Sequence, residues 1–182
     1  MKLPIRTLSL TTVATLMLLA CGKQTTPSAA SSGAATPAQA AVEIIRIGHV
    51  GPLTGSIAHL GKDNENGARL AIEEANAQGV EIGGHKVSFE LIAEDDQADP
   101  KVGTTVAQKL IDARIAGIVG HLNSGTTIPA SALYAQAGIP MISGSATNPK
   151  LTEQGFKTVF RIVGRDDQQG PAVANYLPAE VK

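Results

Sequence analysis

The chain has 182 residues, with 15 Lys and Arg against 16 Asp and Glu, and it contains one Cys. This mildly acidic balance argues against nucleic acid as a partner, because phosphate binding needs a basic surface. One cysteine also excludes an internal disulfide.

The first 20 residues have the pattern of an export signal. Lys2 and Arg6 supply positive charge, and the apolar segment 8–20 is shorter than the ~20 residues that a membrane-spanning helix needs. The signal ends in Leu-Leu-Ala-Cys at 18–21, which resembles the lipobox of bacterial lipoproteins. The resemblance implies that Cys21 is lipidated and becomes the first mature residue. The alternative is a plain secretory signal with a chance cysteine.

Residues 21–41 are dominated by Ser, Thr, Ala, Gly, Pro and Gln. Such a segment buries too little apolar surface to order itself, so we expect a flexible tether. The folded lobe is expected over residues 42–165, which is long enough for one core. Residues 175–182 read as the beginning of a helix with no clear end, and this indicates a fragment of a longer chain.

The folded part alternates between strands and helices. We expect strands at 43–50, 85–93, 115–119, 139–142 and 158–163, and helices at 62–78, 100–113 and 124–136. The order predicts an α/β fold with a parallel sheet, right-handed crossovers and helices on both faces. Ligands of such sheets bind beyond the carboxyl ends of the strands. The relevant loops are therefore 51–61, 94–99, 120–127 and 143–149.

Two of these loops carry the chemistry of a small-ligand site. Residues 120–127 form a polar turn between a strand and a helix, where free N–H groups and the hydroxyl of Ser124 suit a carboxylate. Residues 143–149 add the hydroxyls of Ser145 and Thr147. The two loops together are suited to the carboxylate and ammonium of a small zwitterion, although ordinary capping hydroxyls explain 120–127 equally well in isolation.

Catalytic and metal-binding patterns are weaker. Ser124 and His121 lie three residues apart, but no Gly-x-Ser-x-Gly elbow or third orienting group accompanies them. The acidic residues of loop 94–99 do not have EF-hand spacing, which favours a solvated loop and a helix cap over a metal site. The loop 51–61 lacks the spacing of a phosphate-binding loop. His59 in that loop is kept as a possible ligand contact.

Ordered motifs extend this pattern from residue 44 to the end. They are Gly51-Pro52-Leu53-Thr54-Gly55, Gly61-Lys62-Asp63, Gly67-Ala68-Arg69-Leu70-Ala71, Asp95-Asp96 with Asp99-Pro100, Gly120-His121-Leu122-Asn123-Ser124, Ser145-Ala146-Thr147-Asn148-Pro149 and Phe160-Arg161 followed by Asp167-Gln168-Gln169-Gly170-Pro171. This set resembles the branched-chain amino acid type of periplasmic substrate-binding protein, the receptor of an ABC importer. The resemblance implies two α/β lobes that trap the ligand between them. Residues 166–182 would begin the second lobe, which is largely missing.

The resemblance also implies a set of ligand-binding residues: Ser124, Ser145, Thr147, Leu60, Asn123 and Ala146. Ser124 would bind the carboxylate through its hydroxyl and nearby N–H groups, and Thr147 would hold carboxylate and ammonium. Ser145 would contribute mainly its main chain. Leu60 would form an apolar wall where relatives carry an aromatic residue, which leaves the preferred amino acid open.

The function expected is that of an extracytoplasmic receptor. It would capture an aliphatic, branched-chain L-amino acid and deliver it to an ABC permease. It would act in the periplasm or at the cell surface, anchored to the membrane through Cys21, with no cofactor, metal or nucleic acid involved. The alternatives are a receptor of the same fold for an amide, urea or another small polar ligand, a ligand sensor, or an enzyme.

Overall fold

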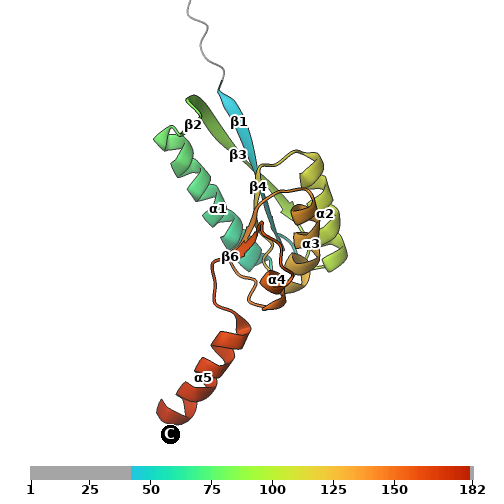
Figure 1. Cartoon of the computed structure of the whole chain (residues 1–182), viewed down its shortest axis with the longest axis vertical. Coiled ribbons are helices and arrows are strands. Elements are labelled where there is room, and N and C mark those ends of the chain that lie inside the picture. The colour runs from blue at the N-terminus through green and yellow to red at the C-terminus, as the bar shows by residue number, and fades with distance from the viewer. Residues whose placement is uncertain (1–41, 181–182) are drawn as a thin grey trace, which may run out of the picture. The chain divides into compact units, whose positions relative to one another are not determined.

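The computed structural model of the chain describes residues 42–180 (Figure 1). The expected signal peptide, the lipidation of Cys21 and the tether lie outside the described residues. The elements are β1 (Glu43–Gly51), α1 (Ala58–Gln78), β2 (Glu81–Ile82), β3 (His85–Asp95), α2 (Pro100–Asp112), β4 (Gly117–Gly120), α3 (Ser124–Gln136), β5 (Met141–Ser143), α4 (Lys150–Glu153), β6 (Val159–Arg161) and α5 (Asp166–Glu180).

The strands form one sheet in the order β2-β3-β1-β4-β5-β6. All neighbours pair in parallel except β2 and β3, which form an antiparallel hairpin at one edge. Helix α1 packs on β1 and β3 from one side, while α2 and α3 pack together on the other (Figure 1). The expectation of a parallel α/β sheet with helices on both faces is confirmed. The two-residue β2 and the four-residue α4 were not predicted.

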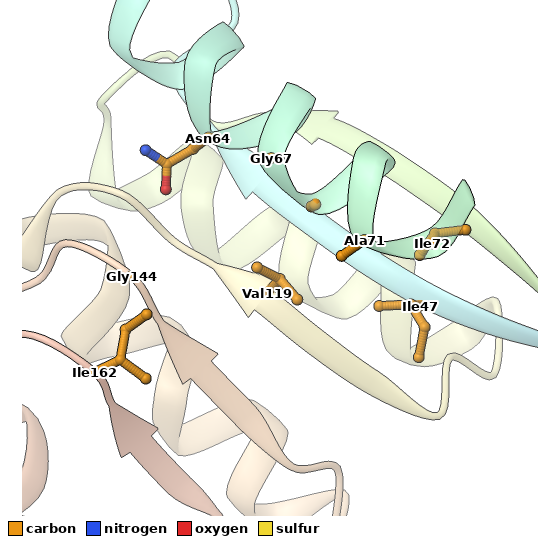
Figure 2. A pocket seen from close by; sticks show the side chains of 9 residues that line it. Ile47, Asn64, Gly67, Ala71, Ile72, Val119, Gly144 and Ile162 are labelled. Atoms are coloured by element: carbon orange, nitrogen blue, oxygen red, sulfur yellow. The ribbon is translucent and has the colours of Figure 1, made fainter. Parts of the chain in front are cut away.

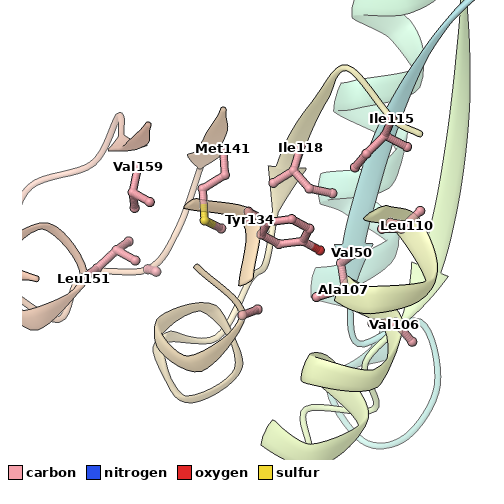
Figure 3. Close-up of a cluster of buried hydrophobic side chains, with 12 residues drawn as sticks. Val50, Val106, Ala107, Leu110, Ile115, Ile118, Tyr134, Met141, Leu151 and Val159 are labelled. Carbon is pink, nitrogen blue, oxygen red and sulfur yellow. The ribbon is translucent and has the colours of Figure 1, made fainter. Parts of the chain in front are cut away.

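The hydrophobic core lies between the sheet and the layer formed by α2, α3 and α4 (Figure 3). Ile118, Met141 and Val159 point into it from three neighbouring strands. Tyr134 of α3 and Leu110 of α2 fill it from the helices, and both are fully buried. Each such side chain contributes roughly 1.5–3 kcal/mol through the apolar surface removed from water.

The opposite face of the sheet is only partly covered. Strand register places His49, Val119, Ile142 and Phe160 in one row across that face. Helix α1 buries His49, but Ile142 and Phe160 stay 44% and 50% exposed. An apolar groove of about 440 Å³ runs between α1 and the sheet beside this row, and Ile162 lies at its end (Figure 2).

The first helix begins earlier than expected. We expected it at Lys62, but α1 starts at Ala58, where Ile57 provides no side-chain cap. No local capping signal in the sequence marks this helix start. Tertiary contact sets the position instead, because Gly61 packs so closely on the main chain of Pro52 that a Cβ there would collide with it.

The helix α2 begins where the sequence indicated. Asp99 accepts hydrogen bonds from the N–H groups of Lys101 and Val102 at 2.7 and 3.1 Å, and Pro100 occupies the first helical position. This is an N-cap with proline at N1. It fixes the direction in which the chain leaves the loop after β3.

Several strand boundaries differ by one or two residues from those expected. Strand β3 continues through Asp95, so Glu94 belongs to the strand and pairs with Lys109 of α2 at 2.7 Å. Strand β5 begins at Met141 because Pro140 has no N–H to donate, although its carbonyl still accepts from Ile118 at 2.9 Å.

The last element is α5, whose side chains are exposed from Asp166 to Leu177. Arg165 fixes its start by hydrogen bonds to Asp167 and to Glu153 of α4. Among residues 42–180, no helix combines the length and the apolar character that crossing a membrane would require.

Candidate functional site

Asp95, the last residue of β3, is hydrogen-bonded to the loop after β1. Its carboxylate accepts a hydrogen bond from the N–H of Leu53 at 2.8 Å and another from the hydroxyl of Thr54. Burial raises the pKa of Asp95, but hydrogen bonds from Thr54, Gln97 and Leu53 outweigh this effect and hold the pKa below its ordinary value. The carboxylate therefore stays ionised and keeps the first two strand-end loops together.

The turn after β4 presents main-chain donors. Asn123 has extended dihedral angles, and its carbonyl accepts from the hydroxyls of Thr126 and Thr127 at 3.0 and 2.7 Å. Within residues 42–180, the N–H groups of Ser124 and Gly125 have no hydrogen-bond partner. The first turn of α3 therefore leaves two donors for an anion.

The loop after β5 is tied to this turn by three serine hydroxyls. Ser143 donates to the carbonyl of His121 at 3.0 Å, and Ser145 donates to the carbonyl of Leu122 at 2.8 Å. The hydroxyl of Ser124 accepts from the N–H of Asn148 at 3.3 Å. The structure thus brings together Ser124 and Ser145, which the sequence placed on separate loops.

The hydrogen bonding of Ser124 decides what its hydroxyl can do. Because the oxygen accepts from Asn148, the single hydroxyl proton is left to donate to an anionic group. The hydroxyl of Thr147 lies on the same loop, and within the described part of the chain it has no partner. Two hydroxyl protons, of Ser124 and Thr147, and two N–H groups of α3 are thus without a partner within residues 42–180.

Arg161 of β6 stabilises the loop after β5 through hydrogen bonds to its main chain. Its guanidinium donates to the carbonyls of Ala146, Asn148 and Pro149 at 3.1, 2.8 and 3.2 Å, and to the hydroxyl of Thr152 at 2.6 Å. The Phe-Arg pair had been noted only as a motif. The structure gives the arginine a specific role, because it binds three main-chain carbonyls on both sides of Thr147.

The other expected site residues lie in different surroundings. Leu60 sits on the first turn of α1 and is 45% exposed, so it is available as an apolar wall. The neighbouring His59 is exposed on the same turn. Ala146 is fully buried in the core, with its N–H donated to Ser143 and its carbonyl bound by Arg161. The side-chain oxygen of Asn123 is buried and unpaired.

The groups considered for catalysis and for metal binding have structural partners. Both ring nitrogens of His121 lie next to Asp96 and Tyr134, and the side chain is fully buried. It therefore does not serve Ser124 as a base. The carboxylates of loop 94–99 bind Lys109, main-chain N–H groups or His121. No cluster of three or more potential metal ligands occurs in residues 42–180.

The apolar groove beside α1 differs chemically from the loop cluster. Its lining is Ile47, Asn64, Gly67, Ala68, Ala71, Ile72, Val119, Gly144 and Ile162 (Figure 2). It offers no hydroxyl side chain and only one polar one. Recognition of a charged small molecule needs several placed polar groups, so the candidate site is the cluster of strand-end loops.

The parallel sheet flanked by helices has the fold of a lobe of a type I periplasmic binding protein. Residues 44–182 match the sequence profile of the family described as "Periplasmic binding protein". The chain belongs to this family.

Its relatives include amino acid-binding proteins. The leucine-specific-binding protein of Salmonella typhimurium is 42% identical over 138 residues, which are 76% of this chain and 37% of that protein. The chain therefore spans little more than a third of that relative's length.

Solved structures of the family share the fold. The branched-chain amino acid transporter substrate-binding protein of Streptococcus pneumoniae, in complex with isoleucine, has a TM-score of 0.69 and 32% identity, covering 76% of this chain and 39% of that one. An ABC transporter solute-binding protein of Rhodopseudomonas palustris, in complex with 3,4-dihydroxybenzoic acid, has a TM-score of 0.65 and 26% identity, covering 76% and 37%.

Proposed function

We propose that this chain forms the N-terminal lobe of a receptor that captures an aliphatic L-amino acid and delivers it to an ABC permease. Residues 42–165 would be the lobe and residues 166–182 the start of the second. The hydroxyl of Ser124 and the first N–H groups of α3 would bind the carboxylate. Thr147 would hold carboxylate and ammonium, with the main chain of Ser145 beside it.

The arrangement of Ser124 carries this proposal. The hydroxyl of Ser124 accepts from Asn148 at 3.3 Å and keeps its proton available to donate, and two free N–H groups lie at the same helix start. Such a group of donors suits a carboxylate and disfavours a cation. Leu60, exposed on the first turn of α1, would supply an apolar wall without charge.

Membrane attachment through Cys21 is a separate proposal that rests on the sequence at 18–21. Cells that express the chain in the presence of a clickable fatty acid should yield labelled protein. Cys21→Ser should abolish the label. Equal labelling of both proteins would contradict the proposed anchor.

A second candidate is a receptor of the same fold for an aromatic acid or an amide. This candidate is supported by the similar protein of Rhodopseudomonas palustris, whose structure contains 3,4-dihydroxybenzoic acid. An aromatic acid shares the carboxylate but lacks the ammonium, and an amide lacks the carboxylate. Comparing such compounds with leucine therefore separates these readings.

The test is a titration of the ¹⁵N-labelled chain with L-leucine, followed through its amide resonances. One lobe makes only part of the contacts, so we expect weak binding with a Kd of about 1 mM or above. The shifts should concentrate at 121–127 and 143–148. L-leucinamide should shift these resonances much less, and benzoate should show whether a carboxylate alone suffices.

Ser124→Ala should remove most of the response, because an unpaired polar group costs about 1–3 kcal/mol. The matched control is Ser88→Ala, since Ser88 lies near the amino end of β3, far from the strand-end loops. A response to leucinamide as strong as that to leucine would argue against carboxylate capture. Wild-type affinity in Ser124→Ala would remove Ser124 from the site.

A further inference from the structure

Three buried side chains form a continuous hydrogen-bonded chain next to the candidate site. His121 Nδ1 lies 3.1 Å from Asp96 Oδ2, and His121 Nε2 lies 3.2 Å from the hydroxyl of Tyr134. All three side chains are fully buried. They come from the loop after β3, the turn after β4 and the last turn of α3. Because none of them reaches solvent, any effect they have on a ligand must pass through other residues.

The hydrogen bonds assign one tautomer to His121. An ionised carboxylate only accepts, so Nδ1 carries the proton and donates it to Asp96. Nε2 of the neutral ring then accepts from the hydroxyl of Tyr134. Burial lowers the pKa of His121, which keeps the ring neutral. Burial raises the pKa of Asp96, but hydrogen bonds led by the one from His121 bring it below its ordinary value.

The main chain of His121 is the point where both ligand-facing loops attach. Its carbonyl accepts from the hydroxyl of Ser143 at 3.0 Å, and at 3.1 Å it shares the one hydroxyl proton of Thr127 in α3, which also donates to the carbonyl of Asn123 at 2.7 Å. The oxygen of Ser143 in turn accepts from the N–H of Ala146 at 3.0 Å. The next carbonyl, that of Leu122, holds Ser145. A rotation of the peptide after His121 would therefore displace both loops together.

No regular secondary structure restrains this peptide. Residues 121–123 lie between β4 and α3 and belong to neither. The side chain of His121 supplies the missing restraint, because it is held at both ring nitrogens by groups on two different elements. Asp96 is itself fixed by the N–H of Ala98, which donates to its second oxygen at 3.0 Å.

We infer that Asp96, His121 and Tyr134 act as positioning residues that set the geometry of Ser124 and of the loop 143–148 for ligand capture. The expected effect on ligand capture rests on the proposed function. The positions of the two loops are argued from the hydrogen bonds alone. The three residues contact no ligand. They fix the shared attachment point of the two loops, so that the donors are already in place when a carboxylate arrives.

The first measurement needs no ligand and no variant. Long-range ¹H–¹⁵N correlation spectra of the histidine-labelled chain report which ring nitrogen carries the proton. We expect His121 to be neutral and protonated at Nδ1, with that proton protected from exchange. A ring protonated at Nε2, or at both nitrogens near pH 7, would overturn the inference.

The second measurement uses Tyr134→Phe, which removes one hydroxyl and keeps the ring in the core. We expect the Nε2 resonance to move, and the amide resonances of 122–125 and 143–148 to shift or broaden. The leucine response should weaken about fivefold, as for one lost hydrogen bond. Tyr176→Phe is the matched control, because Tyr176 is 62% exposed on α5. It should change neither the resonances of His121 and of the two loops nor the leucine response.

Purely structural support predicts a different result. Tyr134→Phe would then lower the melting temperature while the loop resonances and the leucine response stayed as in Tyr176→Phe, and this outcome would overturn the inference. If Tyr134→Phe does not fold, Asp96→Asn takes its place, since it keeps the size of the side chain and faces the same criteria. A wild-type chain without any leucine response would refute the proposed function instead, and the loop resonances of the variants would still test the positioning role.

Discussion

Arg161 offers the most direct test of how the candidate site is built. Its guanidinium donates four hydrogen bonds, three of them to main-chain carbonyls of the loop that carries Thr147. Arg161→Met keeps most of the aliphatic stem and removes all four donors. The loop would then keep its serine bonds to the turn after β4 and the main-chain bond from Asp166 to the carbonyl of Thr147 at 3.0 Å.

The expected loss follows from these contacts. A hydrogen bond from a charged donor is worth about 1.5–3 kcal/mol when buried, but Arg161 is only partly buried, so we take about 1 kcal/mol for each. Holding the arginine in one rotamer costs up to about 2 kcal/mol of conformational entropy. The variant avoids this cost, which offsets part of the loss. The free energy of unfolding should therefore fall by about 2 kcal/mol.

Urea unfolding followed by circular dichroism measures this change, since the chain has no Trp to report by fluorescence. With an m-value of about 2 kcal/mol/M, the midpoint should fall by roughly 1 M. Arg46→Met is the control, because Arg46 makes one surface ion pair, to Glu90 at 3.3 Å, and should lose at most ~0.5 kcal/mol. Equal losses in the two variants would refute the structural role assigned to Arg161.

Three further predictions concern stability. Asp99→Ala should destabilise the lobe by about 1 kcal/mol through loss of the α2 cap, as measured by urea midpoint. Burial lowers the pKa of His49 and of His121 below their ordinary 6.5, so the unfolded chain takes up protons first. Stability should therefore fall as pH drops below about 6.5, and a melting temperature that rises from pH 7 to 5.5 would contradict this. Gly61→Ala should unfold the lobe or cost several kcal/mol, because its Cβ would collide with main chain. Gly67→Ala on the same helix has open space and should stabilise by up to ~1 kcal/mol; similar melting temperatures for the two would count against the collision.

The sequence predicted those features that depend on local signals. Asp99 followed by proline identified the start of α2, and the polar turn identified Ser124 at the start of α3. The start of α1 was misplaced by four residues, because it depends on the contact between Gly61 and the loop after β1. A contact between distant segments leaves no mark in the local pattern.

The same distinction applies to the candidate site. Ser124 and Ser145 could be selected because hydroxyls after strands are visible in the sequence. The pairing of Asp96 with His121 spans 25 residues and that of His121 with Tyr134 spans 13. Both residues of the first pair had been considered separately, as a metal ligand and as a base. Only the fold shows that they satisfy each other.

The partly covered face of the sheet has a consequence for local unfolding. β1 lies between two parallel neighbours and under α1, whereas β6 is an edge strand and β5 exposes Ile142 on its open face. Amide hydrogens should therefore exchange slowest in β1 and β3 and fastest in β5 and β6. The loop that carries Thr147 follows β5 and leads through α4 to β6, while Ser124 follows the inner strand β4. The two halves of the candidate site should therefore differ in local stability, because β4 pairs with the inner strand β1 whereas β5 pairs with the edge strand β6.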